Sequence, residues 1–75
     1  MIEIYGKTGC TFCHRATVFC ELNDLPYKYL QLDEDFSKEQ LLAEFPEAKT
    51  FPQIKRNGMP VGGYNELVAS SKESI

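Results

Sequence analysis

A strand, a helix and a second strand follow one another within residues 2–32, and this succession constrains the fold more than any other feature of the chain. Ile2, Ile4 and Tyr5 predict the first strand, which turn-forming residues then end. Residues 11–23 carry apolar or small side chains at three- and four-residue steps, which is the spacing of one helical face. They are Phe12, Cys13, Ala16, Phe19, Cys20 and Asn23. Residues 27–32 alternate around β-favouring residues and predict another strand. Such a unit normally has parallel strands and a right-handed crossover, so we expect an α/β protein.

The next segment has a clear helix start. Ser37 is expected to be the N-cap, and Gln40 three residues later completes a capping-box pattern. Phe36 before the cap can pack on Leu41, which would fix the angle at which the chain enters the helix. Pro46 closes this helix, because proline cannot donate a helical hydrogen bond.

The C-terminal third predicts a hairpin followed by a last helix. Asn57-Gly58 is the strongest short signal for a two-residue turn, and it joins predicted strands at residues 51–56 and 59–62. Pro60 has no amide hydrogen to donate, so its strand should lie at a sheet edge. Asn65 can cap the last helix. The expected order of elements is therefore β-α-β-α-β-β-α.

Composition narrows the class of protein. A chain of 75 residues has room for one core, so residues 1–75 are expected to form a single domain. Hydrophobic residues at 43% and charged residues at 25% are typical of a globular protein. The net charge of −3 and the pI near 5.0 argue against a nucleic-acid partner. No apolar run approaches the roughly 20 residues that span a bilayer, and residues 1–5 do not resemble a signal peptide, so we expect a cytoplasmic protein without a membrane partner. We also expect the protein to be a monomer.

Cysteine usage points to reactivity or metal binding. Two of the three cysteines are separated by only two residues, which is a poor plan for a secreted disulfide framework. Cys10 and Cys13 stand where the first strand passes into the first helix, and the unpaired amides of a first helical turn stabilise a thiolate. Cys10 is the candidate nucleophile that attacks a substrate disulfide, and Cys13 is the resolving thiol.

Haem and zinc proteins use the same cysteine spacing. Residues 10–14 match the attachment pattern of c-type haem with His14 as axial ligand, but that chemistry requires export and a haem pocket. Zinc could on paper be held by Cys10, Cys13, His14 and Cys20, although structural zinc sites usually take ligands from separate segments. We expect instead that Cys20 is a small buried hydrophobe, that His14 is a surface residue and that the chain holds no metal.

Three motifs together resemble the dithiol glutaredoxins over essentially the whole chain. They are the strand-helix cysteine pair, Thr50-Phe51-Pro52 before the hairpin, and Gly62-Gly63-Tyr64 after it. The resemblance implies the thioredoxin-like (glutaredoxin) fold, a four-stranded mixed sheet flanked by three helices, and the element order expected above agrees with it. It also implies glutathione as the reductant, bound in a groove along these motifs while Cys10 forms the mixed disulfide with its sulfur.

The same resemblance assigns residues to this groove. Pro52 is similar to the family's cis-proline, and a cis bond would let the preceding backbone pair with glutathione like a strand. Lys7 and Lys49 would meet the carboxylate at one end of glutathione. The amides near Asn65 and Glu66 would receive the γ-glutamyl carboxylate, and Glu66 would face the ammonium group. The implied glutathione site is Lys7, Phe12, Lys49, Thr50, Phe51, Pro52, Gly63, Tyr64, Asn65 and Glu66.

The chain departs from the family pattern at two places that bear on redox potential and substrate fit. Thr11-Phe12 stands where proline-tyrosine is usual, and Phe51 stands where valine is usual. The resemblance implies a glutathione-dependent thiol-disulfide oxidoreductase acting on protein disulfides or glutathionylated proteins, with ribonucleotide reductase as one family-level target. Two alternatives stay open: a thioredoxin-like redoxin reduced by a flavoprotein reductase, and a non-catalytic metal or iron-sulfur carrier.

Overall fold

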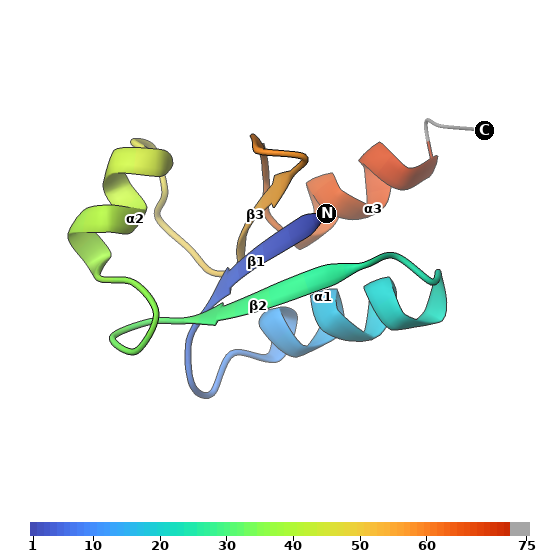
Figure 1. Cartoon of the computed structure of the whole chain (residues 1–75), viewed down its shortest axis with the longest axis horizontal. Coiled ribbons are helices and arrows are strands. Elements are labelled where there is room, and N and C mark those ends of the chain that lie inside the picture. The colour runs from blue at the N-terminus through green and yellow to red at the C-terminus, as the bar shows by residue number, and fades with distance from the viewer. Residues whose placement is uncertain (73–75) are drawn as a thin grey trace.

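The computed structural model describes residues 1–72, and its helices and strands follow the predicted order (Figure 1). In chain order the elements are β1 (Ile2–Gly6), α1 (Thr11–Leu22), β2 (Tyr27–Gln31), α2 (Lys38–Glu44), β3 (Gln53–Arg56), β4 (Met59–Gly62) and α3 (Tyr64–Lys72). None of the helices in this part of the chain is long and apolar enough to cross a membrane.

The four strands form one mixed sheet in the order β2-β1-β3-β4. β1 pairs parallel with β2 through the predicted crossover helix, whereas β1 with β3 and β3 with β4 pair antiparallel. Pro60 lies on β4, which is an edge strand, as its missing amide hydrogen predicts. The predicted four-stranded mixed sheet with three flanking helices is therefore confirmed.

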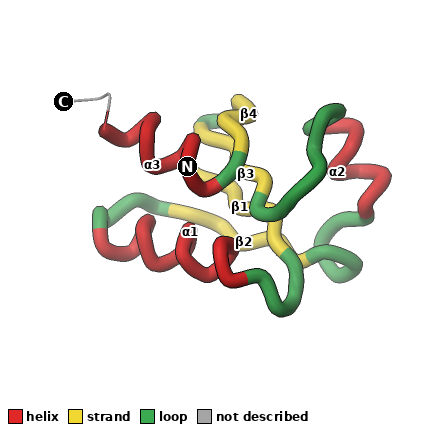
Figure 2. The backbone as a smooth tube through the Cα atoms, turned by 180° about the vertical axis from the view of Figure 1, so that it is seen from behind, coloured by secondary structure: helices red, strands yellow, loops and turns green. Residues whose placement is uncertain are grey.

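Helices cover both faces of the sheet because successive side chains of a strand point to opposite sides. Ile2 and Ile4 of β1 point into a core that α1 and α3 complete with Ala16, Cys20 and Leu67. Tyr5 belongs to a second cluster on the α2 side, whose buried members are Phe36, Leu41 and Phe45. Figures 1 and 2 show α1 and α3 along one part of the sheet and α2 set apart from both.

The start of α2 is the predicted one. The Gln40 amide donates to Ser37 Oγ at 3.2 Å, and the Ser37 amide donates to Gln40 Oε1 at 2.8 Å, so the capping box is complete. Phe36 and Leu41 are buried in the same cluster, in agreement with the expected packing across the helix start. The last residue of the helix is Glu44, two positions before Pro46.

The hairpin forms where the sequence predicts it, but its first strand is shorter. Asn57 and Gly58 have φ values of 52° and 83°, the left-handed backbone that a tight two-residue hairpin turn needs. β3 begins at Gln53 and not at Phe51. The predicted boundary is wrong because Pro52 has no amide hydrogen with which to extend the ladder.

The predicted cap of the last helix is also wrong. Asn65 lies inside the first turn of α3, which begins at Tyr64. The Leu67 amide donates to the Gly63 carbonyl at 3.0 Å, which makes Gly63 the capping residue. Glu66 takes the third helical position and its Oε1 accepts the Gly63 amide at 2.9 Å, the half of a capping box that a glycine cap allows.

Candidate active site

Cys10 occupies the N-cap of α1. A short turn at residues 7–9 leads from β1 into Cys10, whose backbone is extended with φ −99° and ψ 108°. The Cys13 amide donates to Cys10 Sγ at 3.1 Å. The sulfur thus accepts one of the amides that a helix leaves unpaired, and it lies at the positive end of the helix dipole. Both effects favour a thiolate at Cys10 when the protein is reduced.

The two cysteines differ in accessibility. They form a disulfide in this structure, with Cα atoms 5.2 Å apart, within the usual range for such a bond. Cys10 is partly exposed, whereas Cys13 is only 1% exposed. An incoming disulfide or thiol can therefore reach the sulfur of Cys10 more readily than that of Cys13. This asymmetry agrees with an attacking Cys10 and a resolving Cys13.

The turn that carries Cys10 is held against the second strand. Gln31 Nε2 donates to Thr8 Oγ1 at 2.8 Å, and Gln31 pairs with Gly6 in the β1–β2 register. Gly6 is buried against the ring of Tyr29, and a Cβ added to Gly6 would lie 2.2 Å from the Tyr29 hydroxyl oxygen. Gln31 was missed by sequence reasoning, because only the pairing register places it opposite the turn.

A cavity of about 310 Å³ lies beside the cysteine motif. Three segments far apart in sequence line it, and they contribute eight of the ten predicted glutathione residues: Phe12, Thr50, Phe51, Pro52, Gly63, Tyr64, Asn65 and Glu66. The Phe51–Pro52 peptide bond is cis, as the family resemblance implies. Phe12 is 48% exposed, and its ring centroid lies 5.9 Å from that of Tyr64. Helical periodicity grouped Phe12 with the apolar face of α1, but its side chain forms the rim of this cavity.

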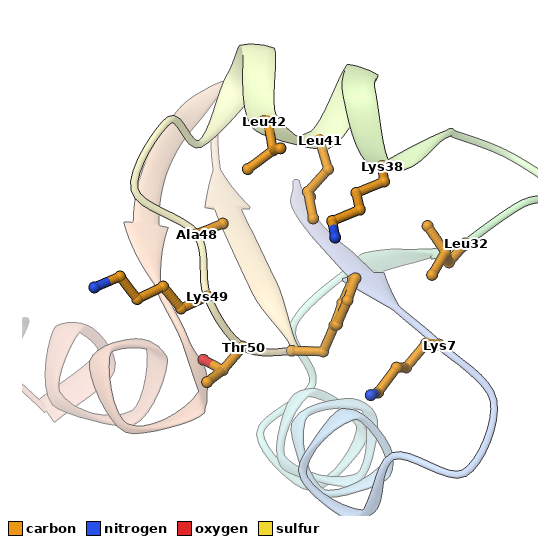
Figure 3. A pocket seen from close by; sticks show the side chains of 9 residues that line it. Lys7, Leu32, Lys38, Leu41, Leu42, Ala48, Lys49 and Thr50 are labelled. Atoms are coloured by element: carbon orange, nitrogen blue, oxygen red, sulfur yellow. The ribbon is translucent and has the colours of Figure 1, made fainter.

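A second cavity of about 490 Å³ adjoins the first, and Thr50 and Phe51 line both. The two remaining predicted residues, Lys7 and Lys49, belong to this second cavity. Lys7 Nζ lies 5.6 Å from the centroid of the Phe51 ring, a cation–π contact. Figure 3 shows the amino groups of Lys7 and Lys49 pointing apart, so they do not converge on one point.

Sequence reasoning missed the α2 side of the second cavity. These residues share no motif and come together only because α2 folds over the loop before β3. They are Leu32, Lys38, Leu41, Leu42 and Ala48.

Glu66 is positioned by the start of α3. One oxygen accepts the Gly63 amide, while the carboxylate as a whole stays exposed at the first cavity. Gly62 has φ 115°, and a Cβ on it would lie 2.9 Å from the Glu66 side chain. Gly62 therefore leaves room for Glu66 as well as adopting a backbone conformation that favours glycine.

The third cysteine and the histidine lie apart from this site. Cys20 is fully buried in the core, and burial raises the pKa of its thiol, which disfavours the reactive thiolate. His14 is exposed on α1. Among the residues that the structure describes, no three His, Cys, Asp or Glu side chains cluster as metal ligands.

Comparisons with known protein families, sequences and structures all find glutaredoxins. The family model "Glutaredoxin" matches residues 2–61. Glutaredoxin 1 from Escherichia coli (strain K12) is 32% identical over 79 residues, which cover 96% of this chain and 93% of the relative. The solved structure of reduced E. coli glutaredoxin matches with a TM-score of 0.83 at 32% identity, over 96% of this chain and 93% of that chain. A buckwheat glutaredoxin-glutathione complex shares the fold, with a TM-score of 0.80 at 18% identity over 97% of this chain and 69% of that chain.

Proposed function

This chain belongs to the glutaredoxin family, and on that premise we propose that it reduces protein disulfides and protein-glutathione mixed disulfides with glutathione as its reductant. Family membership and the Cys10–Cys13 pair make the protein a thiol-disulfide oxidoreductase with the thioredoxin-like fold. One observation carries the finer proposal: a cavity beside the cysteine motif gathers Phe12, residues 50–52 and residues 63–66 from three separate segments.

In the proposed dithiol route, the Cys10 thiolate attacks one sulfur of a protein disulfide and releases the other sulfur as a thiolate. The Cys13 thiolate then attacks Cys10 Sγ, which releases the second substrate thiol and leaves the Cys10–Cys13 disulfide. A first glutathione thiolate opens this disulfide at Cys10, and a second takes the bound glutathione away as oxidised glutathione. Two glutathione molecules thus supply the two electrons that reduce the substrate. On a protein-glutathione mixed disulfide, the Cys10 thiolate attacks the glutathione sulfur and releases the protein thiolate. A free glutathione thiolate then attacks the bound glutathione, which leaves as oxidised glutathione and regenerates the Cys10 thiolate.

The backbone before Pro52 supports the proposed placement of glutathione. The β1–β3 ladder ends where Tyr5 pairs with Gln53, so the backbone of Phe51 lies beyond the ladder and beside the first cavity. An extended cysteine residue of glutathione can add to such a backbone as a short strand. In this orientation the exposed carboxylate of Glu66 would face the ammonium group of glutathione, and Lys7 would face the carboxylate at the opposite end.

We also propose the cytoplasm as the location and a monomer as the working state. Turnover requires a pool of reduced glutathione, which a reducing compartment maintains. Both cysteines and all residues assigned to the glutathione groove come from one chain, so the proposed reaction needs no second subunit. Protein disulfides, among them that of ribonucleotide reductase, are the proposed targets.

The test compares the unmutated protein with Cys10→Ser and Cys13→Ser. The assay couples reduction of a glutathione mixed disulfide to glutathione, glutathione reductase and NADPH, and follows NADPH oxidation. We expect Cys10→Ser to abolish turnover, because it removes the sulfur that accepts glutathione. Cys13→Ser should retain turnover on the mixed disulfide and lose reduction of a protein disulfide by the dithiol route.

Each alternative has its own signature in this test. Absence of glutathione-coupled turnover in the unmutated protein would refute the proposal. Turnover with thioredoxin reductase in place of glutathione would then identify a thioredoxin-like redoxin. Metal analysis and the visible spectrum of freshly purified protein report on a metal or iron-sulfur carrier, which would contain zinc or a coloured cluster.

A further inference from the structure

The charged residues that line the second cavity are positive, although the protein as a whole is negative. The chain has a net charge of −3, with 11 acidic residues. Lys7, Lys38 and Lys49 nevertheless line the second cavity, and no carboxylate is among its nine lining residues. Although the amino groups of Lys7 and Lys49 point apart, three positive groups around one cavity raise the local concentration of anionic ligands, and this attraction weakens as the ionic strength rises.

The three lysines are available to a ligand. In the described part of the chain, the one salt bridge joins Lys55 to Glu44, and neither of these residues lines the cavity. Lys7 lies over the Phe51 ring, which leaves its charge unneutralised. A carboxylate entering the cavity would therefore gain attraction without first displacing an acidic side chain of the protein.

Apart from Lys38, the α2 side of the cavity is apolar. Leu42 is 38% exposed although it is a large aliphatic residue on a short helix, and Leu41 beneath it is 3% exposed. Figure 3 shows both leucines pointing from α2 towards the cavity, with the amino group of Lys38 directed to the same space. An aliphatic side chain could cover this surface and remove it from water, which is favourable in proportion to the apolar area buried.

The second cavity also continues the first. Thr50 and Phe51 line both cavities, so a polypeptide joined to Cys10 through its cysteine can extend from one into the other. We propose that the second cavity binds the segment flanking the reactive cysteine of a protein substrate, and that this segment carries an acidic and an aliphatic side chain. The proposal rests on the dithiol route above and names its substrate class: Lys38 attracts the carboxylate and Leu42 packs against the aliphatic group.

The test uses prereduced protein and synthetic peptides that each contain one disulfide, in a single turnover without glutathione. Three peptides differ only in the two residues that flank their cysteines. These residues are glutamate and leucine in the first peptide, lysine and leucine in the second, and glutamate and serine in the third. The rate of peptide reduction is measured for the unmutated protein, Lys38→Glu and Leu42→Ser. Lys28→Glu on β2 is the matched control, because Lys28 is exposed and lies outside the cavity lining.

The unmutated protein should reduce the glutamate-leucine peptide fastest. Lys38→Glu should slow that peptide about three- to tenfold and accelerate the lysine-leucine peptide by a similar factor, because one exposed attraction becomes a repulsion. Leu42→Ser should slow the peptides that contain leucine by about two- to fivefold and leave the glutamate-serine peptide unchanged. Lys28→Glu should leave the order of the peptides unchanged.

Equal slowing of all peptides by Lys38→Glu, or no preference among them in the unmutated protein, would overturn the docking proposal. Glutathione-coupled turnover of a small mixed disulfide is measured on the same proteins. If the peptide preferences hold while this turnover is absent, the glutathione proposal fails and the docking proposal stands. If the turnover is present and the preferences are absent, the docking proposal alone fails.

Discussion

Gly6 is the buried last residue of β1, and the atoms nearest to a side chain at this position belong to the ring of Tyr29. A Cβ on Gly6 would lie 2.2 Å from the hydroxyl oxygen of Tyr29, 2.6 Å from its Cζ and 2.9 Å from its Cε2. The backbone itself is ordinary, since the positive φ values among the glycines fall at other positions. Gly6→Ala therefore tests steric exclusion by one ring, without a contribution from backbone strain.

The size of the effect follows from two opposing terms. Overpacking of a well-packed site destabilises by about 1–3 kcal/mol, and three ring atoms within 3.0 Å place Gly6→Ala at the upper end of that range. Alanine is favoured over glycine inside a strand by about 0.5–1 kcal/mol. We expect Gly6→Ala to lower the free energy of unfolding by about 2 kcal/mol, a large fraction of the stability of so small a domain.

The assay is a double-mutant cycle with Tyr29→Leu, which removes all three clashing atoms. Urea unfolding of the four oxidised proteins, followed by circular dichroism, gives the free energy of unfolding of each. In the Tyr29→Leu background Gly6→Ala should be neutral or stabilising by up to about 1 kcal/mol, so the coupling should reach about 2–3 kcal/mol. If Gly6→Ala destabilises both backgrounds to the same extent, the assignment of its cost to Tyr29 is wrong.

Two further predictions concern the glutathione end of the site and the buried thiol. Glu66→Gln keeps an acceptor for the Gly63 amide, so it should change the free energy of unfolding by less than about 0.5 kcal/mol. It removes the negative charge proposed to face the ammonium group of glutathione, so the KM for a glutathione mixed disulfide should rise severalfold. An unchanged KM would show that Glu66 is not part of the ligand site. Because burial raises the pKa of Cys20 above that of the unfolded chain, the folded protein retains the proton and the free energy of unfolding should fall as the pH rises above about 8.5. Urea midpoints of the oxidised protein between pH 7 and 10 measure this fall, and Cys20→Ala should make it shallower.

Local sequence patterns predicted most of the fold because the interactions that produce them span only a few residues. The capping box at Ser37 and the left-handed turn at Asn57-Gly58 are contained within four residues each, and both form as expected. The apolar spacing of α1 correctly identified the face that buries Ala16 and Cys20. Phe12 and Asn23 are exceptions on that face. Phe12 lies at the first turn of the helix, beside a cavity and not under the sheet, and Asn23 is exposed at the helix end.

The sequence by itself determined the cysteine pair at a helix start, the order of strands and helices, and, through family motifs, the residues assigned to the glutathione groove. Tertiary structure alone decided that eight of those residues share one cavity, that Gly63 and not Asn65 caps α3, and that Lys38 and Leu42 face the loop next to Phe51. The reason is physical. Caps and turns depend on neighbours along the chain, whereas a cavity depends on strand register and on the packing of α2 and α3, which bring together side chains distant in sequence.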